Sequence, residues 1–274
     1  MSPPKPTPTH GRARTAGTVS RPFSPPRRRR AGGTETGEVG NVQLVLFDID
    51  GTLVDCGGQS RRPFAEALLE VFGATGDLDD YDFSGKTDTR IVYDLMTGAG
   101  IEPARVLAGI EAVRACYLPR LEGSLEAARM RLLPGVGALL EELAARPQVA
   151  LGLLTGNWER GARIKLSRHD LNRYFAFGSF GDGRLDRDEL PPAAWAAARA
   201  ATGRDFGPTD TLIVGDSLFD VACARAHAIP CLAVATGWTE AEALVAAGAD
   251  WVLDDLSGAG RHAAFRPPEP ARVD

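Results

Sequence analysis

Five short, almost continuous apolar runs recur along the chain, and stretches with helical periodicity lie between most of them. A run of this kind is typical of a strand that is buried on both faces of a sheet. Strands that alternate with helices form βαβ units, whose strands are parallel. The sequence therefore predicts an α/β fold with a Rossmann-like parallel sheet. The expected strands are residues 42–47, 149–154, 211–214, 231–234 and 251–253, and the expected helices are 136–145, 159–168, 192–201, 217–227 and 239–247.

A long helical stretch interrupts this alternation between the first and second strands. Its patterns cover residues 63–72, 87–96 and 103–128, and no strand pattern lies among them. We therefore expect an inserted all-helical domain. The domain boundaries that follow are 41–57 and 133–258 for the sheet-containing core, 58–132 for the insertion and 259–274 for a C-terminal tail.

The first 40 residues differ in composition from the rest of the chain. They carry eight basic and two acidic side chains and almost no large apolar residue, so we expect a disordered basic tail. A transit peptide or a nucleic-acid patch would share the arginine-rich composition, but the apolar face of a transit peptide is missing. The remainder has 23 basic and 34 acidic residues, which argues against nucleic-acid binding by the folded body.

Two further patterns narrow the class of protein. No apolar run approaches the roughly 18 residues that a membrane-spanning helix needs, so no membrane partner is expected. The four cysteines are scattered without a CxxC pair, which disfavours a disulfide scaffold or a structural zinc site. We expect a reducing, cytoplasmic location.

Small polar residues and carboxylates follow three of the expected strands. Asp48 and Asp50 come after the first strand, the segment 155–157 (TGN) after the second, and Asp216 after the third. Ligands of open parallel sheets bind beyond the carboxyl ends of the strands, where these residues should meet. Three converging carboxylates suit Mg²⁺, which prefers oxygen ligands, and the glycine-containing loop before a helix suits a phosphate. The pattern predicts a phosphate site over Mg²⁺.

These segments carry a specific resemblance. Residues 47–55 (FDIDGTLVD) look like the first motif of the haloacid dehalogenase superfamily of phosphohydrolases. Residues 155–157 are similar to its second motif and residues 215–220 (GDSLFD) to its fourth, in the same order and spacing. The resemblance spans roughly residues 42–256, and it places the helical insertion where the family has a helical cap.

The resemblance implies a mechanism and a role for each matching residue. Asp48 would be the nucleophile that forms an aspartyl-phosphate, and Asp50 the general acid and base. Thr155, Gly156 and Asn157 would hold the phosphoryl group, and Lys86, in a loop of the insertion, would contact substrate. The expected metal ligands are Asp48, Asp50, Asp216 and Asp220.

The third motif departs from the family pattern. The family places a lysine upstream of the fourth motif, whereas no lysine follows Lys165 in this chain. Arg187 occupies the corresponding region and is the first candidate for the missing cation. Lys165, on the helix after Thr155, is the second candidate. Arginine can supply the same charge through a two-pronged guanidinium.

The leading hypothesis is a Mg²⁺-dependent phosphatase that acts on a small phosphorylated metabolite. A phosphomutase of the β-phosphoglucomutase type would share the motifs and differ in residues of the cap. A non-catalytic binding module is the alternative of a different class, and the acids at three strand ends argue against it.

Overall fold

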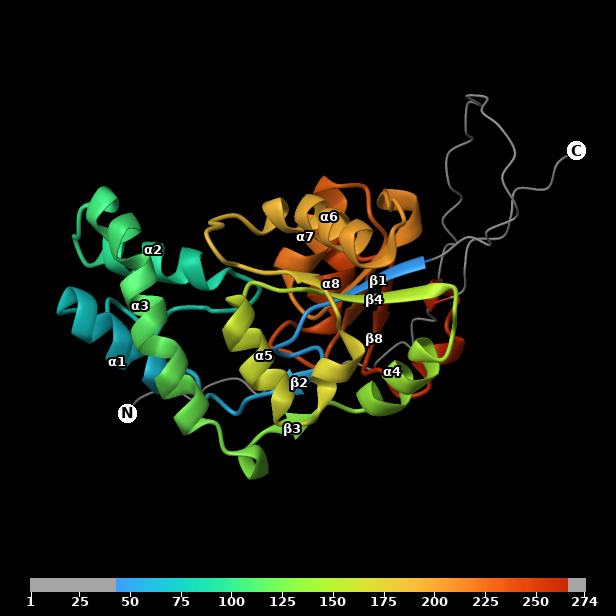
Figure 1. The fold of residues 1–274 in the computed structure, drawn as a ribbon, viewed down its shortest axis with the longest axis horizontal. Coiled ribbons are helices and arrows are strands. Elements are labelled where there is room, and N and C mark those ends of the chain that lie inside the picture. The colour runs from blue at the N-terminus through green and yellow to red at the C-terminus, as the bar shows by residue number, and fades with distance from the viewer. Residues whose placement is uncertain (1–42, 266–274) are drawn as a thin grey trace, which may run out of the picture. The chain divides into compact units, whose positions relative to one another are not determined.

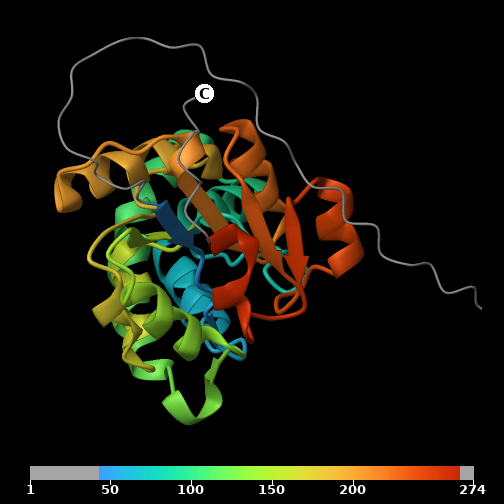
Figure 2. The same cartoon turned by 90° about the vertical axis from the view of Figure 1, so that its right-hand side faces the viewer.

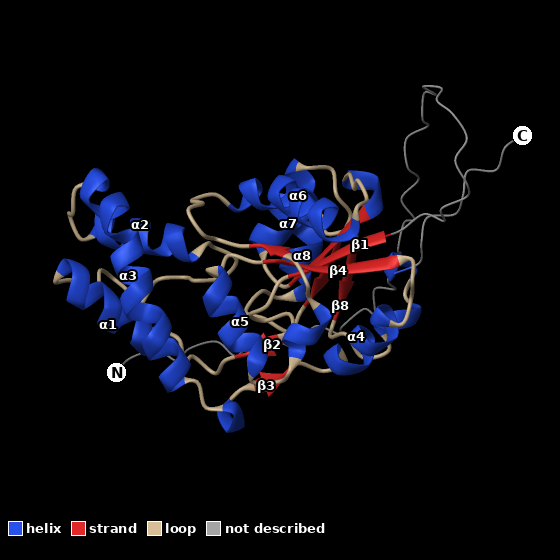
Figure 3. Ribbon diagram, in the orientation of Figure 1, coloured by secondary structure: helices blue, strands red, loops and turns tan. Residues whose placement is uncertain are grey.

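A six-stranded parallel sheet forms the centre of the computed structural model, which describes residues 43–265 (Figures 1 and 3). The strand order is β5-β4-β1-β6-β7-β8, so the first strand lies at the centre, and in Figure 2 strands β1, β6, β7 and β8 follow one another from blue to red. The predicted α/β, Rossmann-like class is confirmed. The strands are β1 Gln43–Phe47, β4 Val149–Leu154, β5 Gly178–Ser179, β6 Thr211–Gly215, β7 Cys231–Val234 and β8 Trp251–Leu253.

Helices cover both faces of this sheet, which explains why its strands are mostly apolar. In β1, Val45 and Phe47 pack in one hydrophobic cluster, while Leu44 and Leu46 pack in a second cluster on the other face. Successive side chains of a strand point to opposite faces, so apolar residues are favoured at every position of a strand with two covered faces. Helices α4 Val136–Ala144 and α5 Glu159–Ser167 contribute to the first cluster. Helices α6 Leu190–Thr202, α7 Leu218–Ala226 and α8 Ala241–Ala247 contribute to the second.

Three of the four α-helices between β1 and β4 form a group of their own beside the end of the sheet to which β1 points (Figure 1). They are α1 Arg61–Phe72, α2 Asp88–Gly98 and α3 Pro103–Ser124, and we call them the helical block. Helix α3 ends four residues earlier than its pattern suggests, because Leu125 adopts an extended conformation. The domain boundaries drawn from the sequence stay a prediction.

The two linkers of the helical block pair with each other. Strand β2 (Val54–Asp55) and strand β3 (Arg131–Leu132) form a two-residue antiparallel ladder that the sequence analysis did not predict. Strand β5 was also missed. Two residues are too few to show any periodicity, so none of these three strands leaves a readable pattern in the sequence.

Residues 259–265, which the sequence analysis assigned to a C-terminal tail, contact the core: Ala264 is buried and Phe265 is wholly buried. The predicted basic tail, residues 1–40, lies outside the described residues. Among residues 43–265, no helix has both the length and the apolar character needed to cross a membrane.

Candidate active site

The carboxyl ends of the central strands bring the predicted acids together. Strand β1 lies between β4 and β6, and the amide of Asp48 donates to the carbonyl of Val214 at 2.9 Å. The residue after β1 therefore lies beside the residue after β6, Asp216. The sheet changes winding direction at β1, which is where open α/β sheets bind ligands.

Three buried carboxylates form the centre of this site. Asp48, Asp216 and Asp220 each offer an oxygen within 4.8 Å of the others. Burial raises the pKa of Asp48 to about 6; Arg187 opposes this shift, and Asp220 and Asp50 add to it. Burial and then the charges of Asp48 and Asp220 raise the pKa of Asp216 as well. Carboxylates that are costly to ionise together, with oxygen donors only, fit a hard divalent cation.

Asp220 differs from the other two acids because protein donors already occupy both of its oxygens. One oxygen accepts from Arg187 at 2.5 Å, and the other accepts from the amide and the hydroxyl of Ser217, at 3.1 and 2.6 Å. Ser217 and Asp220 together form the capping box that starts helix α7. Asp220 thus fixes the arginine and the loop that carries Asp216.

Arg187 contacts Asp48, the residue for which the family resemblance implies the role of nucleophile. Its Nη2 is 3.1 Å from an oxygen of Asp48 and also contacts Asp220, while its Nη1 donates to the carbonyl of Gly85 at 2.9 Å. Burial alone would lower the pKa of Arg187, but the adjacent Asp220 and Asp48 raise it. The guanidinium is therefore a fixed positive charge beside Asp48.

Lys165 contacts a different acid. Its Nζ donates to Asp50 at 2.6 Å and to the side-chain oxygen of Asn157 at 2.6 Å. Asn157 and the thiol of Cys56 also donate to Asp50, at 2.8 and 3.4 Å. Burial would raise the pKa of Asp50, yet Lys165 and these hydrogen bonds lower it. The structure thus brings both candidate cations into the site, each with its own carboxylate.

The loop after β4 lies against the helical block. Thr155 is wholly buried, and its hydroxyl accepts from the side-chain amide of Asn157 at 2.9 Å. A Cβ on Gly156 would collide with the carbonyl of Lys86, so only glycine permits this approach. The Nζ of Lys86 donates to the carbonyl of Asp82 and lies 4.0 Å from the centre of the Tyr81 ring. Lys86 meets the predicted phosphate loop through its main chain, and a role of its side chain in substrate binding stays a prediction.

Residues 85–89 of the helical block, which we call the strap, make an extended set of contacts with the core. The amide of Asp88 donates to the carbonyl of Gly156 at 2.8 Å, and the carboxylate of Asp88 accepts from the amide of Trp158 at 2.8 Å. The hydroxyl of Thr89 donates to the carbonyl of Gly181 at 2.7 Å. Thr87 caps α2 and also donates to the carbonyl of Arg184 at 2.8 Å.

Sequence reasoning missed two buried residues at this junction. Asp88 lies in the helical pattern predicted over residues 87–96, so its position was visible but its partner was not. Tyr117, in the middle of α3, packs on Phe64 and Trp158 with ring centres 5.0 and 5.9 Å apart. A tyrosine at an inward-facing helical position does not differ, in sequence alone, from an ordinary core residue.

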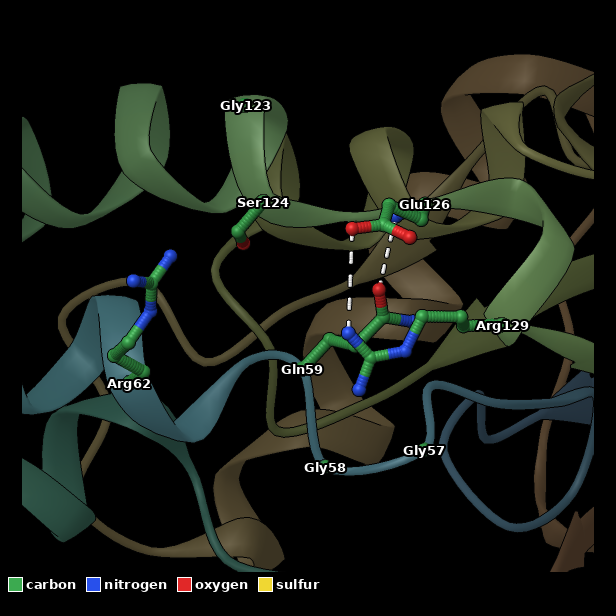
Figure 4. Close-up of a pocket in the computed structure, with 8 residues that line it drawn as sticks. All are labelled: Gly57, Gly58, Gln59, Arg62, Gly123, Ser124, Glu126 and Arg129. Carbon is green, nitrogen blue, oxygen red and sulfur yellow. Dashed lines mark hydrogen bonds and ion pairs between the residues drawn. The ribbon is translucent and has the colours of Figure 1, made fainter.

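A surface pocket lies between the two linkers of the helical block (Figure 4). Gln59 bridges them: its amide nitrogen donates to the carbonyl of Cys56 at 2.9 Å, and its oxygen accepts from the amide of Glu126 at 2.9 Å. The pocket contains none of the clustered acids. Its lining residues are Gly57, Gly58, Gln59, Arg62, Gly123, Ser124, Glu126 and Arg129.

Comparisons with known proteins identify the family of the chain. Residues 45–234 match the family model described as haloacid dehalogenase-like hydrolase. The chain is 29% identical over 221 residues to a phosphoglycolate phosphatase of Synechococcus elongatus, and the aligned region covers 79% of this chain and 94% of that protein. It is 30% identical over 225 residues to phosphoglycolate phosphatase 1 of Pseudomonas aeruginosa, covering 78% and 77% of the two chains.

Solved structures are similar in fold. A predicted phosphatase from Clostridium acetobutylicum gives a TM-score of 0.61 at 22% identity, covering 81% of this chain and 97% of that one. A haloacid dehalogenase-like hydrolase from Bacteroides fragilis also gives 0.61, at 24% identity, covering 80% and 99%.

Proposed function

The chain belongs to the haloacid dehalogenase-like hydrolases, and from that membership we propose a Mg²⁺-dependent phosphatase that acts on small metabolites through an aspartyl-phosphate. The observation that carries the proposal is the placement of Asp48. It lies beside a fixed guanidinium and within 4.8 Å of two further buried acids. Phosphatase activity is also the activity named for the relatives.

Asp48 attacks the phosphorus atom in this proposal. Its side chain is 7% exposed, so few water molecules compete with the phosphoryl group for it. Arg187 orients one carboxylate oxygen and offsets part of the negative charge that arrives with the phosphoryl group. Positioning and charge neutralisation of this kind supply most of the catalysis of phosphoryl transfer.

Asp50 acts as the general acid and the general base of the reaction. Its side chain is 41% exposed, whereas Asp48, Asp216 and Asp220 are nearly or wholly enclosed, so Asp50 is the acid that faces a leaving group. Lys165 and Asn157 hold its carboxylate in place. A phosphoryl dianion that approaches Asp50 favours the protonated form, because a nearby like charge raises a carboxyl pKa. Asp50 then donates that proton to the leaving oxygen and later takes one from the hydrolytic water.

The acids suit a bound Mg²⁺. Asp48 and Asp216 would supply carboxylate oxygens, and Asp50 would complete the set of metal ligands that the family motif implies. Asp220 would hold Arg187 and the Asp216 loop in place. When bound, the ion would neutralise charge shared by the carboxylates and the phosphoryl oxygens. The helical block would act as the cap, with its strap already seated on the phosphate loop.

Release of inorganic phosphate tests the proposal. Phosphoglycolate is the first substrate to assay, because relatives carry its name, and a wider set of phosphorylated metabolites follows. We expect Mg²⁺-dependent turnover, and at least about a 10³-fold loss of kcat in Asp48→Asn, since an amide is a poor nucleophile.

A matched control is Asp55→Asn, which alters an acid that pairs with Arg131 and contacts none of the clustered carboxylates. This variant should retain activity. Turnover of Asp48→Asn near the wild-type rate, with an unchanged melting temperature, would remove Asp48 from its assigned role. Conversion of a sugar phosphate to an isomer without free phosphate would favour a phosphomutase instead.

A further inference from the structure

Gly85 is the residue of the strap that lies against the start of helix α7. Its φ is +65°, a conformation that residues with a Cβ rarely adopt. A Cβ at this position would also collide with the hydroxyl of Ser217 and the Cβ of Phe219, where α7 begins. The main chain of Gly85 therefore approaches the core as closely as only a glycine can.

The carbonyl of Gly85 accepts a hydrogen bond from Arg187, which is 6% exposed. Nη1 of Arg187 donates to this carbonyl at 2.9 Å. Nη2 serves acceptors of the core, namely the carboxylates of Asp48 at 3.1 Å and Asp220 at 2.5 Å and the carbonyl of Leu154 at 3.2 Å. Nε has no hydrogen-bond partner among the described residues, so the two terminal nitrogens orient the guanidinium. One of them is thus anchored on the helical block and the other on the proposed nucleophile.

The two ends of the guanidinium cannot move independently. The group is planar and rigid, so the place of one terminal nitrogen limits where the other can lie. If the strap moved away, Nη1 would lose the Gly85 carbonyl, and a buried donor without an acceptor is costly. The guanidinium would turn to regain a partner, and that turn would carry Nη2 away from Asp48. The seat of the strap and the orientation of Arg187 are therefore linked.

We propose that Gly85 is a positioning residue for the reaction: its carbonyl fixes Arg187, and Arg187 in turn holds Asp48 in place for attack. The inference rests on the proposed phosphatase function and gives the helical block a second task. Besides covering a substrate, the seated block completes the arrangement of charges around Asp48. Displacing the strap should therefore slow the chemical step. An arginine suits this link, because one terminal nitrogen can reach the strap while the other stays on Asp48.

A double-mutant cycle with Gly85→Ala and Arg187→Ala tests the link. Gly85→Ala pushes the strap away from α7, and it should lower kcat for phosphate release from p-nitrophenyl phosphate with Mg²⁺ by about tenfold, the effect of losing one hydrogen bond to a charged group. In the Arg187→Ala background the same substitution should cost about twofold or less, because the residue through which it acts is gone. A block that only encloses the substrate would give the same fold-loss in both backgrounds.

Gly73→Ala is the matched control. Gly73 ends helix α1 of the helical block with a φ of +73°, and a Cβ there would meet no atom within 4 Å. Alanine at this position introduces similar backbone strain without displacing the strap. We expect the kcat of Gly73→Ala to match its parent in both backgrounds. The melting temperatures of the two glycine variants show whether each is folded under the assay conditions.

Hydrogen exchange tests the link from the opposite end and needs no turnover. Coupling between two sites is reciprocal, so a weaker hold of Arg187 on Gly85 should loosen the strap. Arg187→Lys keeps the charge but has a single nitrogen. In this variant the amide of Asp88, which donates to the carbonyl of Gly156, should exchange about tenfold faster than in wild type. The amides of strand β7 should exchange at the wild-type rate.

The outcomes separate this inference from the proposed function. Equal losses from Gly85→Ala in both backgrounds, or unchanged exchange of the Asp88 amide in Arg187→Lys, would overturn the link and leave the phosphatase in place. If Gly85→Ala does not fold, the exchange measurement decides. No phosphate release by wild type from p-nitrophenyl phosphate or from phosphorylated metabolites would instead remove the proposed function, and with it any role of Gly85 in catalysis, whatever the exchange shows.

Discussion

Arg187 reaches acceptors in four separate parts of the chain. One nitrogen serves the carboxylates of Asp48 and Asp220 and the carbonyl of Leu154, and the other serves the carbonyl of Gly85 in the strap. A guanidinium can do this because its donors diverge within one plane. A lysine ammonium offers a single nitrogen, so it cannot reach these acceptors from two separate atoms as the guanidinium does.

We therefore expect Arg187→Ala to lose about 10²–10³ in kcat, as is common when a fixed charge is removed from a reaction centre. Arg187→Lys should retain more activity because it keeps the charge. Steady-state assays of both variants, beside Arg173→Ala as an exposed control, measure the effect. Normal turnover of Arg187→Ala, with a crippled Lys165→Ala, would transfer the role to Lys165.

Asp88 should make stability depend on pH. Burial raises its pKa from 3.8 to about 6, although Lys165 and the Trp158 amide oppose the shift. Between these values the folded protein holds the Asp88 proton more tightly than the unfolded chain. The contribution of Asp88 to the free energy of unfolding is thus full below about pH 4 and is lost as pH rises through about 6.

Asp88→Asn lacks this titration. The melting temperature of the variant minus that of wild type should therefore increase from about pH 4 to pH 6 and stay constant above it. Thermal melts at intervals across pH 4–8 measure the difference. A difference that is the same at every pH would show that Asp88 has an ordinary pKa.

Single residues differ in how far their surroundings could be predicted. Asp48 and Asp216 follow buried strands that become neighbours in any parallel sheet with this strand order, so their meeting was predictable. Lys165 and Arg187 were both candidates for one role, because sequence spacing does not say which carboxylate a long side chain reaches. The structure gives each its own partner, Asp50 and Asp48.

At the scale of elements, the linkers of the helical block depend on Gln59. Its side-chain oxygen accepts from the amide of Glu126 in the linker after α3, while its side-chain nitrogen donates to the carbonyl of Cys56 in its own linker, and the residue is 8% exposed. Figure 4 shows it in the wall of the pocket between these linkers. Truncation leaves the carbonyl of Cys56 and the amide of Glu126 without this partner.

Gln59→Ala should lower the free energy of unfolding by about 1–3 kcal/mol, the cost of leaving such groups unpaired. Arg62→Ala changes an exposed side chain that lines the same pocket, and it should stay within about 0.5 kcal/mol of wild type. Urea denaturation of the three proteins compares them. Equal losses in both variants would show that Gln59 does not join the linkers.

Element length decided which parts of the fold were predictable. Strands such as β4, six residues long and apolar, carry a clear pattern. The two-residue strands β2, β3 and β5 are held by neighbours that their own sequence does not specify. Contacts of the strap, by contrast, depend on where two distant segments meet, and no local pattern encodes that.

For the molecule as a whole, a bound metal should appear as added stability. Burial, and after it the neighbouring carboxylates, raise the pKa values of Asp48 and Asp216, so both acids are costly to ionise without a cation. A cation that binds only the folded state raises the free energy of unfolding by about 2.7 kcal/mol at one hundred times its dissociation constant. Mg²⁺ should therefore raise the melting temperature of wild type.

Asp216→Asn removes one carboxylate of the cluster and should reduce this rise. Differential scanning calorimetry with and without Mg²⁺ gives the comparison, and Asp55→Asn serves as the control outside the cluster. An equal rise in wild type and Asp216→Asn would place the stabilising ion elsewhere.

Main-chain carbonyls provide most of the acceptors that dock the strap and the core on each other. They belong to Gly85, Gly156, Gly181 and Arg184. A carbonyl persists whatever side chain its residue carries, so substitutions elsewhere in the helical block leave this docking register in place. During evolution, the side chains of the helical block that face a substrate can therefore change while the block keeps its position on the core. New substrate specificities can arise without a new way of docking the block.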